Sequence, residues 1–151
     1  MGPVLGLECK LYLCADGIGE TPGAAEGVEV VNARDVKIPL SKTEADVSTR
    51  GGGGWKAAVG AMKDASIDFD MLYVENDASF ASLLDSFING TPIGVRAAKG
   101  DPAVAGTEVF EADCEVMKLD ETESLDGVTA YAVTVKPTFS ANPPRAFTVA
   151  A

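Results

Sequence analysis

Histidine is absent from the 151-residue sequence, which removes the commonest general base and the commonest transition-metal ligand of proteins. Cysteine is scarce: Cys9, Cys14 and Cys114 are an odd number without C-x-x-C spacing, so neither a zinc site nor a disulfide framework is predicted. Basic residues are few as well, with 12 against 23 acidic residues and a net charge of −11. Because nucleic acids and anionic membrane surfaces attract proteins through Lys and Arg, we expect the chain to bind neither.

Long apolar runs and the common catalytic motifs are missing too. No run approaches the roughly 18 apolar residues of a membrane span, and no Ser or Cys has a His to activate it. The run Gly51–Gly54 is followed by Trp55-Lys56, not by the Gly-Lys-Ser/Thr of a phosphate-binding loop. The D-x-D-x-D-G pattern of a calcium loop is also absent. We therefore expect no enzyme, no cofactor and no metal site.

What the sequence does contain is a pattern of short strands, with 16 Gly and 8 Pro that favour many turns. Two segments alternate apolar and polar residues with the period of a half-buried strand, Ala65–Val74 and Val109–Leu119. Shorter apolar segments predict further strands at residues 4–14, 28–31, 36–40, 93–98 and 128–135. Residues 15–27 and 41–60 are predicted as loops, and the second is long enough to be functional.

One helix is predicted over residues 77–88, ending at about residue 89. Asn76 or Asp77 can cap its N-terminus, and Gly90 followed by Pro92 ends it. Its large apolar residues follow the i, i+3, i+4, i+7, i+8 spacing of a single stripe, for which core packing is the expected role. The stripe consists of Phe80, Leu83, Leu84, Phe87 and Ile88.

The order of these elements predicts a mainly β (α+β) fold. We expect an antiparallel β-sandwich or barrel with one flanking helix at about residues 77–89 and a long central loop. A chain of this length fits one domain, here residues 1–151, with a Pro-rich C-terminal segment at residues 136–151. A domain of this size needs no metal or disulfide to be stable.

Acidic residues line two of the predicted strand faces. Asp68 and Asp70 share one face, and Glu111, Asp113 and Glu115 share another. Neighbours on one face lie about 7 Å apart, so their carboxylates repel one another and burial of such a face is costly. The residues allow three interpretations: a solvated sheet face, a wall that repels polyanions, or a calcium site.

The single Trp, Trp55, follows the four glycines in an otherwise polar segment. An aromatic side chain of this size leaves much apolar area in water unless another group covers it. It either folds back onto its own domain or anchors in a neighbouring subunit, a setting in which Trp is enriched.

The central part of the chain resembles phage major tail tube proteins. The resemblance begins with Lys42–Arg50 (KTEADVSTR), a glycine-rich turn and Gly54-Trp55-Lys56. It continues through Met62–Asp77 and the predicted helix, and it ends at Gly90–Ile93. Residues 32–97 match well, and the C-terminal strands match loosely.

This resemblance implies a β-sandwich with a flanking helix that self-assembles into hexameric rings, stacked into the hollow tail tube of a phage or phage-like particle. The inner wall would be a sheet, and the long loop would reach between subunits or rings. No catalytic residue is implied. The partners would be further copies of the chain, tape-measure and tail terminator or tip proteins, and DNA as a cargo that does not stick. The protein would be located in the virion tail after assembly in the host cytoplasm.

The acidic strand faces then become candidates for the wall of that tube, because an acidic wall repels DNA and lets it slide. The lumen-wall candidates are Asp68, Asp70, Glu111, Asp113 and Glu115. The subunit-interface candidates lie in the predicted loop and are Arg50, Gly51, Gly52, Gly53, Gly54, Trp55 and Lys56. Two alternatives come from other classes: a monomeric calcium- or carbohydrate-binding β-sandwich module, and an enzyme that uses carboxylates alone.

Overall fold

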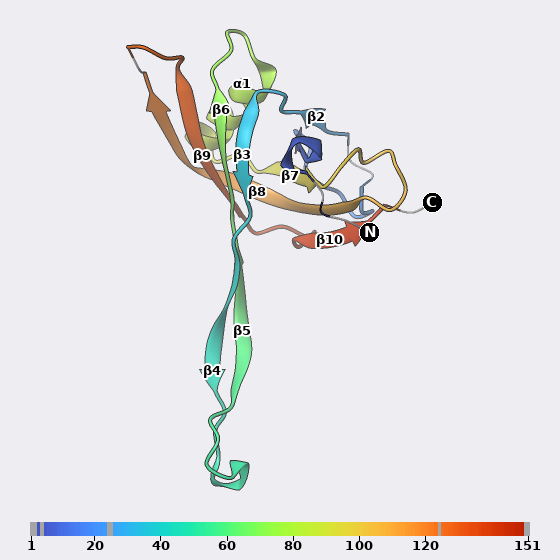
Figure 1. Cartoon of the computed structure of the whole chain (residues 1–151), viewed down its shortest axis with the longest axis vertical. Helices are drawn as coiled ribbons and strands as arrows, with labels where there is room; N and C mark the ends of the chain where they lie inside the picture. Colours follow the sequence, from blue (N-terminus) through green and yellow to red (C-terminus); the bar gives the residue numbers. More distant parts are fainter. Residues whose placement is uncertain (1–2, 4, 24–25, 124, 150–151) are drawn as a thin grey trace.

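The computed structural model describes residues 3, 5–23, 26–123 and 125–149, and antiparallel strands dominate it. Eight strands of the described chain form one sheet in the order β2-β1-β7-β8-β9-β6-β3, with β10 paired to β8. Their bounds are β1 Lys10–Cys14, β2 Val28–Glu29, β3 Ala33–Lys37, β6 Ile67–Leu72, β7 Ile93–Ala98, β8 Glu108–Thr122, β9 Ala130–Pro137 and β10 Arg145–Thr148. The other two, β4 Leu40–Asp46 and β5 Ala58–Ala65, form a hairpin that projects away from this sheet (Figure 1).

The sheet bends so strongly that its two ends form two layers. Figure 1 shows β3 and β6 crossing β7 and β8. The inward side chains of both layers belong to one buried cluster, which joins Ile67 and Met71 of β6 to Leu11 of β1 and Val95 of β7. Burial of each such side chain contributes about 1.5–3 kcal/mol to folding. The expected mainly β, sandwich-like fold is therefore confirmed, and the described strands do not close into a barrel.

Strand β8 connects the two layers and is the longest strand, with 15 residues. Its first half pairs with β7 on one side and with β10 on the other, and its second half pairs with β9. Ala112, Cys114 and Val116 point into the core and Phe110 packs against it, as the alternation of Val109–Leu119 predicts. A register shift between Val116 and Lys118 marks a bulge within the half that pairs with β9.

The single α-helix of the described chain, α1, runs from Ala78 to Asn89, as the sequence predicts. Asp77 caps its N-terminus, because Oδ1 of Asp77 accepts a hydrogen bond from the Ser79 N–H at 3.1 Å. Gly90 ends the helix with φ +68°, a left-handed conformation that favours glycine. Its N–H donates to the Ser86 carbonyl at 2.9 Å.

The apolar stripe of α1 enters the core only in part. Leu83 is fully buried against the sheet, and Phe80 is partly buried beside it. Leu84, Phe87 and Ile88 are 38%, 49% and 67% exposed. The expectation that the whole stripe packs into the core is therefore wrong, because the helix contacts β8 along only one side.

The expectation of a long central loop at residues 41–60 is also wrong. Residues 40–46 and 58–65 are paired strands, and only residues 47–57 form the connection between them. Sequence reasoning missed these strands because it relied on burial, and neither strand packs against a core of its own chain.

Smaller differences concern the first predicted strand, the strand predicted at Ala65–Val74 and the C-terminal segment. The strand expected at residues 4–14 is a 3₁₀ turn, η1 Gly6–Glu8, followed by β1, and Val4 lies outside the described residues. The strand expected at Ala65–Val74 is divided at Ser66, whose N–H donates to the Pro39 carbonyl at 3.2 Å. Strand β10 within the Pro-rich C-terminal segment was not expected.

Candidate assembly site

The β4–β5 hairpin, residues 40–65, is here called the arm (Figure 1). Its register pairs Leu40 with Ala65 at the base and Asp46 with Ala58 at the far end. The arm continues directly from β3 and β6, which pair with each other in the sheet. The 8 residues of β5 span about 26 Å at about 3.3 Å per residue. Every residue from Asp46 to Asp64 is exposed.

The tip of the arm, residues 47–57, is held by hydrogen bonds of its own. The Ser48 hydroxyl oxygen accepts a hydrogen bond from the Ala57 N–H at 2.8 Å. Gly53 and Gly54 have φ of +67° and +88°, which glycine adopts without strain, and they reverse the chain. The tip is therefore a defined turn, although no other part of the described chain covers it.

All seven residues expected at a subunit interface, Arg50–Lys56, lie in this tip. Trp55 is 82% exposed, so it does not fold back onto its own domain. The arm has four basic and three acidic residues, a net charge of +1, whereas the rest of the chain has eight basic and twenty acidic residues, a net charge of −12. Within the tip the only charged residues are Arg50 and Lys56. The tip is thus a cationic end, with an exposed Trp, on an acidic molecule.

Asp68 and Asp70 lie on the open side of β6, as the alternation predicts. Asp68 is half-buried and Asp70 is exposed. Across β9 they stand opposite Thr134 and Ala132, which in turn stand opposite residues of β8. Residues directly opposite share one side of a sheet. We call this surface the outer face; it consists of Lys37, Asp68, Asp70, Lys118, Asp120, Ala132 and Thr134.

The outer face has three acidic and two basic residues. Nζ of Lys118 lies 2.9 Å from Oδ2 of Asp120. The hydrogen bond to Asp120 and the charge of that carboxylate raise the pKa of Lys118. The outer face is therefore weakly acidic, with a net charge of −1, and one of its two cations is already paired. The residues at its centre, Ala132 and Thr134, have short side chains.

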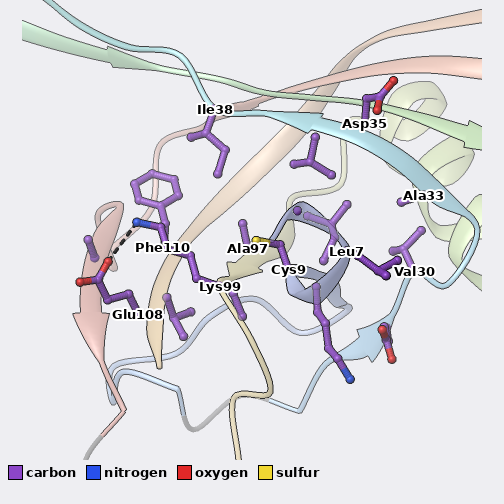
Figure 2. A pocket seen from close by; sticks show the side chains of 18 of the residues that line it. Leu7, Cys9, Val30, Ala33, Asp35, Ile38, Ala97, Lys99, Glu108 and Phe110 are labelled. Carbon is purple, nitrogen blue, oxygen red and sulfur yellow. Dashed lines mark hydrogen bonds and ion pairs between the residues drawn. The ribbon is translucent and has the colours of Figure 1, made fainter. Parts of the chain in front are cut away.

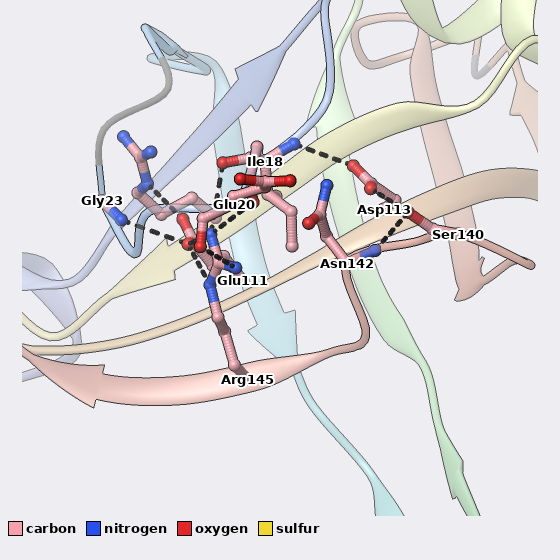
Figure 3. Close-up of polar contacts among 10 residues, drawn as sticks. Ile18, Glu20, Gly23, Glu111, Asp113, Ser140, Asn142 and Arg145 are labelled. Atoms are coloured by element: carbon pink, nitrogen blue, oxygen red, sulfur yellow. Dashed lines mark hydrogen bonds and ion pairs between the residues drawn. The ribbon is translucent and has the colours of Figure 1, made fainter.

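Glu111 contradicts the expected solvated face, because its side chain is fully buried (Figure 3). Its Oε2 accepts a hydrogen bond from Nε of Arg96 at 3.1 Å, and its Oε1 accepts one from Nε of Arg145 at 2.8 Å. The Gly23 N–H also donates to Oε1, at 3.2 Å. Two guanidinium groups thus offset the cost of burying the carboxylate, a possibility that strand alternation alone does not reveal.

Asp113 is buried as well, and it holds the loop that follows β1 (Figure 3). Its Oδ1 accepts a hydrogen bond from the Ile18 N–H at 2.8 Å, and its Oδ2 accepts one from the Ser140 hydroxyl. A Cβ at Gly17 would lie 2.8 Å from Oδ1, so the loop approaches this closely only with glycine there. The lumen-wall prediction is therefore wrong for Glu111 and Asp113 within this chain, because residues 15–23 cover them.

Glu115, the third acid of that face, is half-buried near the end of α1. Its Oε1 lies 3.4 Å from where a Cβ on Gly90 would be, and it stands opposite Lys136 of β9. Of the five lumen-wall candidates, only Asp68 and Asp70 share an open surface.

A hollow beside α1, which we call the aromatic pocket, was not expected from the sequence. Tyr73 and Phe80 meet edge to face with ring centroids 5.4 Å apart, and Phe80 and Tyr131 are 4.7 Å apart. The pocket is lined by Tyr73, Phe80, Leu84, Phe87, Leu119, Glu121, Glu123, Thr129 and Tyr131. The sequence signal for this pocket is the width of the apolar stripe on α1, because the sheet covers only part of that stripe.

A second, larger hollow of about 1090 Å³ lies between η1 and strands β1, β3, β7, β8 and β10 (Figure 2). Three acidic and three basic residues line it, and two of them, Lys99 and Glu108, form an ion pair of 2.9 Å. No group of three or more His, Cys, Asp or Glu in the described part of the chain is placed to hold a metal ion. None of the described helices is long and apolar enough to span a membrane.

Comparisons with known proteins agree on the fold. No protein-family model and no curated protein matches the sequence. A chain from the virion of a native gene transfer agent particle matches with a TM-score of 0.70 and 16% identity, over 90% of this chain and 95% of its own. A chain from the tail of an empty gene transfer agent particle, solved with C6 symmetry, gives 0.68 and 16% over the same shares. The SPP1 tail tube gives 0.69 and 11%, over 89% of this chain and 75% of its own.

The chain has the tail tube fold. At 11–16% identity the likeness concerns the path of the backbone, not individual side chains. The resemblance noted over residues 32–97 therefore extends, as a fold, across nine-tenths of the chain.

Proposed function

We propose that the protein is the structural subunit of a tail tube, in which copies assemble into hexameric rings that stack into a conduit for DNA. The observation that carries this proposal is the match over nine-tenths of the chain to the SPP1 tail tube and to a tail with C6 symmetry. The proposed role is structural, not catalytic.

The arm supports the proposal independently of the comparisons. A two-stranded hairpin without a packing partner is only marginally stable in water. The arm nevertheless presents Leu40, Val59 and Met62, which are 51–76% exposed, together with Trp55. A neighbouring copy would cover these side chains and stabilise the hairpin. The net charge of +1 on the arm complements the −12 on the remainder of that neighbour.

The outer face is the best candidate for the inner wall of the tube. Its weak net negative charge and its small central side chains, Ala132 and Thr134, would give DNA no cationic surface to bind. Asp68 and Asp70 keep the role proposed for them from the sequence. Glu115 could contribute only at the margin, because it lies next to Gly90.

The same proposal assigns the other partners and the location. Tape-measure and tail terminator or tip proteins would contact the inside and the ends of the tube, DNA would pass as cargo, and the subunit would be assembled in the host cytoplasm into the virion tail. The arm, residues 40–65, would be the assembly segment of one domain.

Negative-stain electron microscopy of the concentrated protein tests the proposal. We expect rings or tubes with six-fold symmetry. Strict monomers at every concentration would contradict it. If the protein is monomeric and calcium raises its melting temperature, a monomeric binding module is favoured instead.

A further inference from the structure

The aromatic pocket beside α1 has an open apolar floor that nothing in the described chain covers. Its volume is about 560 Å³, within the usual range of binding pockets. Tyr73 and Phe87 are 43% and 49% exposed. These rings and Leu84 form a surface on which a large flat side chain can stack.

The rim of the pocket is anionic. Glu121 and Glu123 line it, and none of the described residues that line it is basic. Glu121 stands directly opposite Tyr131 across β8 and β9, which places its carboxylate beside the aromatic rings. Burial and then the negative charge of Glu121 raise the pKa of the Tyr131 hydroxyl. The pocket therefore favours an aromatic group that is flanked by cations.

The tip of the arm has this chemistry. Trp55 is the only Trp of the chain, is 82% exposed, and is accompanied by Arg50 and Lys56 without any acidic residue. The larger hollow beside η1 is a poorer match, because its three acidic residues are balanced by three basic ones. The tip cannot reach the pocket of its own chain, since the arm projects away from α1 (Figure 1).

We propose that the tip of one copy docks into the aromatic pocket of a second copy, with Trp55 against Phe80 and Phe87 and with Arg50 and Lys56 beside Glu121 and Glu123. The inference rests on the proposed function, because it requires two copies in one assembly. It adds to that function a specific contact, in which charge fixes the orientation of the tip and the buried ring supplies most of the affinity.

Photo-crosslinking within the assembled protein tests the contact directly. Trp55 is replaced by p-benzoylphenylalanine, assemblies are irradiated, and the linked peptides are identified by mass spectrometry. We expect links between copies to peptides that contain residues 80–87 or 119–131. Links confined to any other part of the second copy would overturn the docking proposal and leave the tail tube proposal intact.

A charge exchange tests the same contact without altering Trp55. The double variant R50E/K56E should raise the protein concentration required for assembly roughly tenfold or more, because it places like charges together. Adding E121K/E123K should restore assembly. The matched control adds E8K/D16K, two exposed acids outside the arm and the pocket. Rescue by the control but not by E121K/E123K would contradict the pairing.

Different results would contradict the tail tube proposal and the docking proposal. If the unaltered protein forms no rings or tubes, the proposed function fails. If it forms them and the emission of Trp55 does not shift to shorter wavelength on assembly, the tip remains in water and the docking proposal alone is overturned. A shift that is lost in the surface variant F87D supports it.

Discussion

The arm and the body, by which we mean the described residues outside 40–65, are both built from antiparallel hairpins, but they are stabilised differently. In the body, inward side chains such as Ile67 and Val95 are fully buried, and even the charged Glu111 has its partners inside the chain. In the arm, every residue from Asp46 to Asp64 is exposed. The comparison shows that the core of the body is complete within a single copy, whereas the strands of the arm have no core of their own.

The charges of the two regions differ in the same way. The carboxylate of Glu111 is matched by Arg96 and Arg145 within the body. In the arm, Lys42 stands directly opposite Lys63 across the hairpin, a pairing that destabilises an isolated sheet. Acidic groups of another copy would relieve this repulsion, which is a second reason to expect that the arm binds the body of a neighbour.

The largest effect should follow from removing the arm. Replacing residues 42–63 by Asn-Gly leaves the Ser41–Asp64 pair joined by a tight hairpin turn. We expect assembly to be abolished and the melting temperature of the body to change by only a few degrees, measured by electron microscopy and circular dichroism. A shortened protein that still forms tubes would show that the arm is dispensable.

Removing the buried charge should destabilise the body instead. Glu111→Ala leaves two guanidinium groups without their carboxylate and should lower the free energy of unfolding by about 3–5 kcal/mol, measured by urea titration. The matched control is Asp70→Ala on the outer face, for which we expect a change within about 0.5 kcal/mol. Equal effects of the two substitutions would contradict the different roles assigned to these acids.

The outer face should determine whether the tube binds DNA. The double variant D68K/D70K should still assemble but should sediment together with double-stranded DNA at low salt, and release it as salt rises. The unaltered tubes should leave DNA in solution. DNA binding by both proteins to the same extent would remove this face from the lumen.

The smallest effect concerns the thiols, and it distinguishes the interior of the body from its surface. Burial, followed by the charge of Asp113, raises the pKa of the Cys114 thiol to about 12, and burial raises that of Cys14. At neutral pH these two buried thiols should remain protonated and unlabelled by maleimide, while the exposed Cys9 reacts. Mass spectrometry of the native protein should show one label; two or three labels would indicate that the body opens.

The sequence predicts those features that depend on local periodicity and on the residues at helix ends. The alternation in Val109–Leu119 and the cap at Asp77 both correspond to the structure. It could not reveal contacts between distant segments. Arg145 reaches Glu111 from β10, so the acid appears exposed when its strand is considered alone. The sequence predicts a loop where the arm lies, because the strands of the arm have no apolar face toward a core of their own chain.

The central claim is that the arm is completed by another copy of the protein, and hydrogen exchange of its backbone amides tests this most directly. The account predicts that residues 40–65 exchange at least tenfold more slowly in assembled tubes than in dissociated subunits, while amides of β7 and β8 change little. Equal exchange of the arm in the two states would contradict the claim.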